Sequence, residues 1–231
     1  MSDLSVFRRS RPIKTGRLIA PIICLLHVLL LLLTVPFAGA QTLPLPTHAA
    51  GFYTAGWVRA VAVDASGRFY IGGPFSFVNG VSRNHLARFN ADGTLDTAWN
   101  PNPDGYDISV LAIAGDTVYV GGSFTAIGGQ ARNRLAALDA TTGAATAWNP
   151  NPDSWVGSLA VSGETVYAGG NFTAIGGQAR NHIAALDATT GAATAWNPNP
   201  DGYGVNALAV SGDTVYAGGN FTAIGGQSRS G

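Results

Sequence analysis

The sequence predicts an all-β fold and favours a β-propeller of four-stranded antiparallel blades. A Gly-Gly pair recurs every 48 or 49 residues, at Gly72-Gly73, Gly121-Gly122, Gly169-Gly170 and Gly218-Gly219. Repeats of this length are typical of propellers and solenoids. Each repeat holds short runs of β-branched and aromatic residues between Gly, Asn, Asp and Pro turn signals, without sustained helical periodicity. A β-solenoid with two coils per repeat is the alternative architecture.

The third repeat illustrates the four strands expected in each blade. Turn signals separate them, and they lie at Val156–Val161, Thr165–Ala168, His182–Asp187 and Ala192–Trp196. A Gly-rich loop through Ile175-Gly176-Gly177 is expected between the second strand and the third. Four antiparallel strands form the blade of a β-propeller. The periodic Phe and Trp side chains would then fill the spaces between blades, because aromatic rings bury a large area.

The repeat spacing divides residues 54–231 into about three and a half blades. Their approximate bounds are 57–105, 106–154, 155–202 and, in part, 203–231. This number is too small to close a ring of the usual roughly 4–8 blades. We therefore expect further blades of the same chain beyond residue 231.

The first forty residues have the order of a secretory signal peptide. A basic start is followed by an apolar stretch over residues 18–35 and by Ala38-Gly39-Ala40. We expect a signal helix within residues 1–40, cleavage after Ala40, and an extended lead-in over residues 41–53. The alternative is an uncleaved anchor helix, because 18 apolar residues lie at the lower limit for spanning a bilayer.

Composition narrows the classes of partner. Charged residues make up 11% of the chain, and eight basic residues, none of them Lys, and twelve acidic residues follow Ala40. Binding to nucleic acid is not expected, because its affinity depends on Lys and Arg near phosphates. Membrane contact is expected only through the signal segment. The single cysteine, Cys24, lies in that segment, so the repeats have no disulfide or cysteine-based metal site.

Two known groups of repeat share motifs with this chain. The segment Arg83–Asp96 and the segment Tyr70-Ile71-Gly72-Gly73-Pro74-Phe75 resemble the delta-60 repeat of large secreted bacterial proteins. Leu138–Gly143, followed by Trp148, is similar to the blade motif of quinoprotein-type propellers. The resemblance implies a propeller fold and export but no defined activity. A quinone cofactor is not expected, because vicinal cysteines are absent and the sequence shows no non-repeating polar cluster to hold one.

Repetition argues against an active site. Catalysis on a repeated scaffold needs unique polar residues, whereas nearly every polar residue here recurs. His85 and His182 occupy a position that is Arg134 in the repeat between them. We expect no catalytic, cofactor-binding or metal-binding residue, and therefore no enzyme. Asp139, Asp187 and their equivalent Asn90 are expected to bond to nearby backbone N–H groups in turns.

Two further repeated sets have a structural interpretation and an ion-binding alternative. Arginines recur at Arg83, Arg132, Arg180 and Arg229. They are expected to donate to loop carbonyls and stack on a ring, or alternatively to form a cationic ring that captures anions. The sequence Asn-Pro-Asn-Pro-Asp recurs at residues 100–104, 149–153 and 197–201. It is expected to be a rigid connection, or alternatively a calcium loop.

Aromatic residues that follow these loops are the candidate ligand surface. They recur at similar spacing, at Trp57, Tyr106, Trp155 and Tyr203. Exposed rings on one face could stack on sugars, or the rings could instead plug the gaps between blades.

We therefore expect a secreted or cell-surface propeller that acts as a structural or interaction module, with a protein or a glycan as partner. The alternatives are a carbohydrate-binding module that uses these aromatics, and the non-catalytic part of a larger secreted enzyme. Function depends on sites rather than on the fold.

Overall fold

The computed structural model describes residues 53–229, and this part of the chain is all-β. No helix occurs within it, and so none that could span a membrane. The expected signal helix and nearly all of the expected lead-in lie outside the described residues. The predicted all-β class is confirmed.

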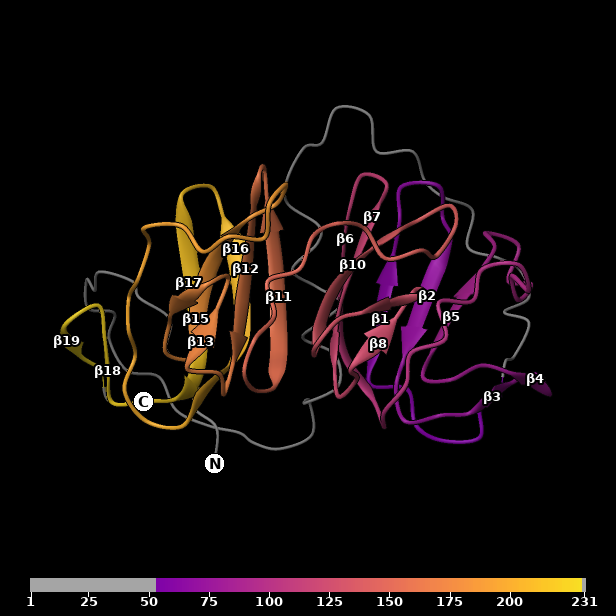
Figure 1. The fold of residues 1–231 in the computed structure, drawn as a ribbon, viewed down its shortest axis with the longest axis horizontal. Coiled ribbons are helices and arrows are strands. Elements are labelled where there is room, and N and C mark those ends of the chain that lie inside the picture. Colours follow the sequence, from indigo (N-terminus) through magenta and orange to yellow (C-terminus); the bar gives the residue numbers. More distant parts are fainter. Residues whose placement is uncertain (1–52, 230–231) are drawn as a thin grey trace, which may run out of the picture. The chain divides into compact units, whose positions relative to one another are not determined.

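Four successive antiparallel sheets follow one another along residues 53–229 (Figure 1). Sheet 1 contains β1 (Ala60–Val63), β2 (Phe69–Gly72) and β5 (Leu86–Phe89). Sheet 2 contains β6 (Ile108–Ala114), β7 (Thr117–Gly122) and β10 (Leu135–Asp139). Sheet 3 contains β11 (Val156–Ser162), β12 (Thr165–Gly170) and β15 (Ile183–Asp187). Sheet 4 pairs β16 (Gly204–Ser211) with β17 (Thr214–Asn220).

The segment expected as a Gly-rich loop forms a two-residue-strand hairpin in every repeat. The hairpins are β3 (Phe77–Val78) with β4 (Val81–Ser82), β8 (Ala126–Ile127) with β9 (Gln130–Ala131), β13 (Ala174–Ile175) with β14 (Gln178–Ala179), and β18 (Ala223–Ile224) with β19 (Gln227–Ser228). Gly176 and Gly177, at the turn of the third hairpin, have φ of 61° and 77°. Two successive residues with positive φ are the signature of a tight hairpin turn, which glycine adopts without strain.

The expected fourth strand is reduced to a single β-bridge. In the third repeat the prediction covered residues 192–196, but the structure pairs only Ala193 with Leu186 in this region. The Ala193 N–H does not bond to β15. It donates instead to the Gly176 carbonyl of the hairpin, at 3.0 Å. Two bonds join the flanking residues to β15, from the Asp187 N–H to the Ala192 carbonyl at 2.9 Å and from the Thr194 N–H to the Ala185 carbonyl at 2.8 Å. The segment therefore contacts both β15 and the hairpin.

The Gly-Gly pair marks two close backbone approaches. A Cβ on Gly72 would lie 2.5 Å from Cγ2 of Ile108 in the next sheet, and a Cβ on Gly169 would lie 2.9 Å from Cγ1 of Val205. A Cβ on the second glycine of each pair would lie about 2 Å from a carbonyl of its own sheet, as at Gly170 beside Trp155. Because only hydrogen fits at both positions, the 48–49 residue period reflects sheet packing.

Aromatic residues fill the spaces between neighbouring sheets, as predicted. Phe124 and Phe172 are buried in these spaces, whereas Phe75 is buried in a separate cluster formed within the first repeat. One apolar cluster joins sheets 1 and 2, and another joins sheets 2 and 3. Tyr119 meets Trp148 edge-to-face, with ring centroids 5.2 Å apart. The strands nearest the neighbours are the first ones, since β6 contacts β1 and β11, and β11 contacts β16. We call β1, β6, β11 and β16 the inner strands.

Candidate functional site

The four candidate aromatics occupy two different structural positions. The Trp155 carbonyl accepts the Asn171 N–H at 2.9 Å, and in the preceding repeat the Asp107 carbonyl plays this part for Ser123, at 2.8 Å. Trp155 therefore corresponds to Asp107, and Trp57 occupies the same position beside Gly73. Tyr106 lies one residue earlier, in a loop that is one residue longer. The sequence spacing concealed this difference. The longer loop places Tyr106 one repeat length before Trp155 in the sequence, although the two residues are not structurally equivalent.

Tyr203 matches Tyr106, and both are held by the same backbone bond. The Tyr106 N–H donates to the Ser123 carbonyl at 3.2 Å, and the Tyr203 N–H donates to the Asn220 carbonyl at 2.8 Å. The preceding glycines, Gly105 and Gly202, have φ of 86° and 82°. A Cβ on Gly105 would lie 1.8 Å from the Ser123 carbonyl oxygen. Only glycine fits there, so the backbone that presents each tyrosine is fixed.

Exposure separates one aromatic from the other three. Trp57, Tyr106 and Tyr203 are 75%, 83% and 77% exposed. Trp155 is half-buried, and its Nε1 donates to Oγ of Ser109 at 3.1 Å. Its ring covers Gly157, where a Cβ would lie 1.9 Å from the ring. Trp155 therefore packs against the inner strands, which fits the alternative that a ring plugs a gap, whereas the other three rings face solvent.

A non-repeating polar network joins the starts of the inner strands of sheets 1, 2 and 3. Arg59 Nη1 donates to Asp107 Oδ2 at 2.6 Å, Ser109 Oγ lies 3.3 Å from the same oxygen, and Trp155 donates to Ser109. This network was not predicted from the sequence. One feature of the sequence could have revealed the network. The residue at the β-bulge differs between repeats, and it is Ser109 in sheet 2, Gly157 in sheet 3 and Asn206 in sheet 4.

The network is suited to joining sheets rather than to catalysis. Asp107 is 8% exposed, and within the described part of the chain its Oδ1 has no hydrogen-bond partner. Arg59 neutralises this carboxylate from the neighbouring sheet, which favours close approach of β1 and β6. Ser109 donates to a carboxylate that already carries an arginine, so it has no free base to activate it. Among residues 53–229, no group of three or more His, Cys, Asp or Glu could hold a metal ion.

The repeated arginines donate to loop carbonyls, as predicted. Arg180 donates to Ala179 and Thr194, each at 2.7 Å. Arg132 makes the same pair of bonds one repeat earlier, and Arg83 is buried. The expected stacking on a ring is seen at a different arginine, Arg88, whose guanidinium lies 5.4 Å from the centre of the Trp99 ring. Guanidinium groups used in this way are poorly placed to capture an anion.

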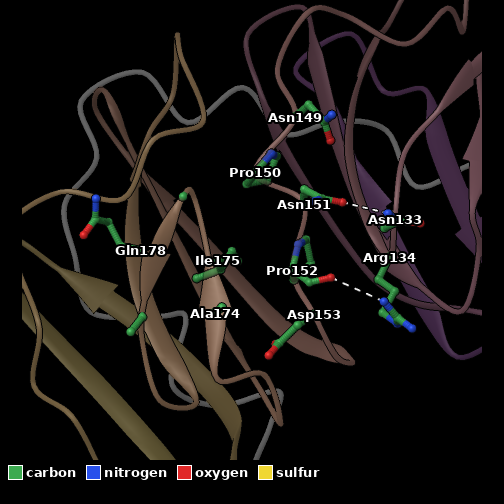
Figure 2. A pocket seen from close by; sticks show the side chains of 12 residues that line it. Asn133, Arg134, Asn149, Pro150, Asn151, Pro152, Asp153, Ala174, Ile175 and Gln178 are labelled. Atoms are coloured by element: carbon green, nitrogen blue, oxygen red, sulfur yellow. Dashed lines mark hydrogen bonds between the residues drawn. The ribbon is translucent and has the colours of Figure 1, made fainter.

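The Asn-Pro-Asn-Pro-Asp loop lies across a hairpin and borders a groove of about 680 Å³ (Figure 2). Asn151 in this loop accepts from Asn133 at 2.7 Å, and the Pro152 carbonyl accepts from Arg134 at 3.3 Å. Asp153 and Ile175 also line the groove. A groove of about 440 Å³ occupies the corresponding place one repeat earlier. The loops therefore form a surface hollow beside two successive hairpins, β8 with β9 and β13 with β14.

The carboxylate of this loop is committed to the hairpin. Asp153 Oδ1 accepts the Thr173 N–H at 2.9 Å, and Oδ2 accepts the Thr173 hydroxyl at 2.6 Å. Burial raises the pKa of Asp153, but these bonds and one from the Ala174 N–H outweigh it and hold the pKa below its usual value. Both oxygens of Asp153 are thus engaged, which supports a rigid connection over the calcium alternative.

Asp139 and Asp187 act as predicted in their turns, whereas Asn90 does not. Asp187 Oδ1 accepts the N–H groups of Thr189 and Thr190, and Asp139 does the same for its own turn. In the first repeat, Asn90 instead donates to the Thr94 hydroxyl, and Asp92 accepts the Thr94 N–H. In the first repeat the side chain that accepts a backbone N–H in this turn is therefore Asp92, two residues after Asn90.

Residues 65–98 and 116–141 match the family model described as "Domain of unknown function (DUF5122) beta-propeller". This match supports the interpretation of the repeats as those of a β-propeller repeat family. No curated protein matches the chain. Two similar solved structures are of computationally designed proteins. Ika8 has 16% identity and a TM-score of 0.50 over 72% of this chain, and Ika4 has 15% identity and a TM-score of 0.49 over 70%. The chain spans 44% of the length of Ika8 and 84% of that of Ika4.

Proposed function

We propose that this chain is an exported, non-catalytic β-propeller module that binds another macromolecule. The observation that carries the proposal is how the polar side chains are used. The repeated arginines bond to carbonyls, and the loop and turn aspartates bond to backbone N–H groups. Of the residue sets singled out from the sequence, the aromatic one stays exposed, and at Tyr106 and Tyr203 it is presented by a fixed backbone. Binding requires such exposed anchors, whereas catalysis requires uncommitted polar groups.

Carbohydrate is the second, more specific candidate for the ligand. Trp57, Tyr106 and Tyr203 are all more than 70% exposed and lie at the starts of inner strands in three different sheets. Aromatic rings lose little side-chain entropy on binding and offer a flat apolar face with a polar tip. The non-polar faces of sugar rings stack on such surfaces. Trp155 is excluded from this set, because its ring packs against the protein.

Glycan-array screening of the purified chain, followed by calorimetric titration of any glycan bound, tests the carbohydrate candidate. Trp57→Ala, Tyr106→Ala and Tyr203→Ala are each expected to weaken glycan binding about tenfold, as loss of roughly 1.4 kcal/mol of contact energy requires. Tyr53→Ala is the matched control, because Tyr53 is an exposed tyrosine outside this set. Equal affinity in all four variants would exclude the aromatic surface.

Export forms part of the proposal and has its own test. The basic, apolar and small-residue order of residues 1–40 supports it. A chain expressed in a bacterial host is expected to appear outside the cytoplasm with Gln41 as its first residue, by mass spectrometry of the intact protein. Ala38→Leu and Ala40→Leu, which enlarge the expected cleavage site, should leave the uncleaved chain at the membrane. A chain that stays in the cytoplasm with Met1 intact would refute export.

A further inference from the structure

The groove beside the hairpin of β13 and β14 is lined by side-chain amides that the fold leaves free. Asn149 and Gln178 are exposed, and their side chains make no hydrogen bond within residues 53–229. Asn133 donates one N–H to Oδ1 of Asn151 at 2.7 Å. Oδ1 of Asn133 and the N–H groups of Asn151 have no partner in the same part of the chain. The groove therefore offers amide donors and acceptors to a ligand.

The amides are oriented before any ligand arrives. Asn151 lies between two buried prolines, which restrict the backbone on either side. Ile175 and Gln178 of the hairpin lie across the groove from this loop (Figure 2). The same amide bond joins Asn84 to Asn102 and Asn181 to Asn199, each at 2.9 Å. A site fixed in this way loses little conformational entropy on binding.

The charges at the grooves favour a neutral ligand. In the larger groove Arg134 and Asp153 carry opposite signs, and each bonds to the protein. In the groove one repeat earlier the only charged lining residue is Asp104, and both of its oxygens accept from Thr125. Because the carboxylates are occupied and the charges in the larger groove cancel, an ionic ligand would meet no free counter-charge.

The backbone of the hairpin argues against an extended peptide as the ligand. An added peptide strand needs a strand edge with free N–H and C=O groups. β13 pairs with β14 on one side. On its other side the Ala174 carbonyl accepts the Asp153 N–H at 3.1 Å, and the adjacent Gly176 N–H donates to the Pro150 carbonyl at 2.7 Å. The groove therefore presents side-chain amides rather than an open strand edge.

We propose that these two grooves bind a neutral oligosaccharide through their side-chain amides. A sugar hydroxyl both donates and accepts hydrogen bonds, so neighbouring hydroxyls match the mixed donors and acceptors of the amides. Tyr106 follows the smaller groove, two residues after Asp104, and its 83% exposed ring adds an apolar face for a sugar ring. The inference rests on the proposed function, and it names the class of glycan and the groups that recognise it.

The test is calorimetric titration of the full chain with cellohexaose, maltohexaose and chitohexaose, with hexagalacturonate as the charged comparator. At least one neutral hexasaccharide should bind more tightly than hexagalacturonate, with an affinity that changes little between low and high salt. A variant that combines Asn100→Ala, Asn149→Ala and the equivalent Asn197→Ala removes the free loop amides and should bind about tenfold more weakly. Asn206→Ala is the matched control, because Asn206 is an exposed amide that lines neither groove.

Circular dichroism confirms folding, and Gln130→Ala with Gln178→Ala on the hairpins replaces the loop variant if that variant does not fold. Three results would overturn the proposal: no binding of any neutral hexasaccharide, tighter binding of hexagalacturonate, and unchanged affinity in the amide variants. The proposed function fails separately. A hexasaccharide lost in Tyr106→Ala but retained in the amide variants would exclude the grooves and leave the aromatic surface as the binding site.

Discussion

Trp148 and Trp196 occupy the same sequence context but different surroundings. Each follows Ala-Thr-Ala and precedes Asn-Pro-Asn-Pro, and each meets a tyrosine edge-to-face with centroids 5.2 and 5.5 Å apart. Yet Trp148 is 3% exposed and Trp196 is 37% exposed. Trp148 also donates to the Asp187 carbonyl of the next sheet, at 2.9 Å. Local sequence therefore determines the ring pair, whereas β15, the third strand of sheet 3, covers Trp148. Sheet 4, which follows Trp196, has only β16 and β17 within the described residues.

The largest difference is expected between alanine variants of these two tryptophans. Trp148→Ala should lower the free energy of unfolding by about 3–5 kcal/mol, because it leaves a cavity and an unpaired carbonyl. Trp196→Ala should cost about 1–2 kcal/mol, because less apolar area is lost. Urea unfolding monitored by circular dichroism measures both. Equal losses would show that β15 adds nothing to the burial of Trp148.

Two hairpin glycines, Gly176 and Gly225, allow the cost of backbone strain to be measured apart from the cost of a clash with a neighbouring segment. Gly176 and Gly225 have φ of 61° and 60°, so alanine at either should cost about 1–2 kcal/mol. A Cβ on Gly176 would also lie 2.4 Å from the Ala193 nitrogen, whereas a Cβ on Gly225 would meet nothing within 4 Å. Gly176→Ala should therefore lose a further ~1–3 kcal/mol in urea unfolding. A larger loss for Gly225→Ala would contradict the packing described for the hairpin.

Acid should weaken the loop-to-hairpin connection. The pKa of Asp153 is lowered in the folded chain, so its contribution to stability is present above the ordinary pKa of about 3.9 and is lost as pH falls through the folded value. Asp153→Asn should reduce the fall in melting temperature below about pH 4. Asp213→Asn, in the turn between β16 and β17, is the control. An unchanged pH profile in Asp153→Asn would refute this role.

The smallest effect is expected at the non-repeating network. Arg59→Ala removes the ion pair with Asp107, in which the arginine side chain is half exposed. The loss should be about 0.5–1 kcal/mol and should shrink in high salt. Urea unfolding at two salt concentrations measures it. No loss at low salt would show that the ion pair does not join sheets 1 and 2.

The sequence was sufficient where the information is local or periodic. The strand expected at Val156–Val161 is observed at Val156–Ser162, and the Gly-Gly period reports sheet packing. The hairpin at Gly176-Gly177 was missed, because its strands are only two residues long. The expected fourth strand is reduced to one bridge, at which two hydrogen bonds join the segment to β15 and the Ala193 N–H faces the hairpin. The length of such short pairings is not visible in local propensity.

The candidate site shows the same limit. The exposed rings were found by their spacing, but the separation of Trp155 from Tyr106 depends on one loop residue and on which carbonyl each neighbour uses. The contact between Arg59 and Asp107 joins residues 48 positions apart, and only the packing of β1 against β6 brings them together. A repeat pattern reports what the blades share, so it conceals residues that act because they differ.

Hydroxyl-radical footprinting with mass spectrometry tests most directly whether neighbouring sheets supply the burial. Trypsin places Trp148 and Trp196 in different peptides, because Arg134 and Arg180 precede them in turn. If β15 of the following sheet covers Trp148, then Trp196 should be oxidised several times faster, in keeping with exposures of 37% and 3%. Equal oxidation rates for the two tryptophans would contradict the account.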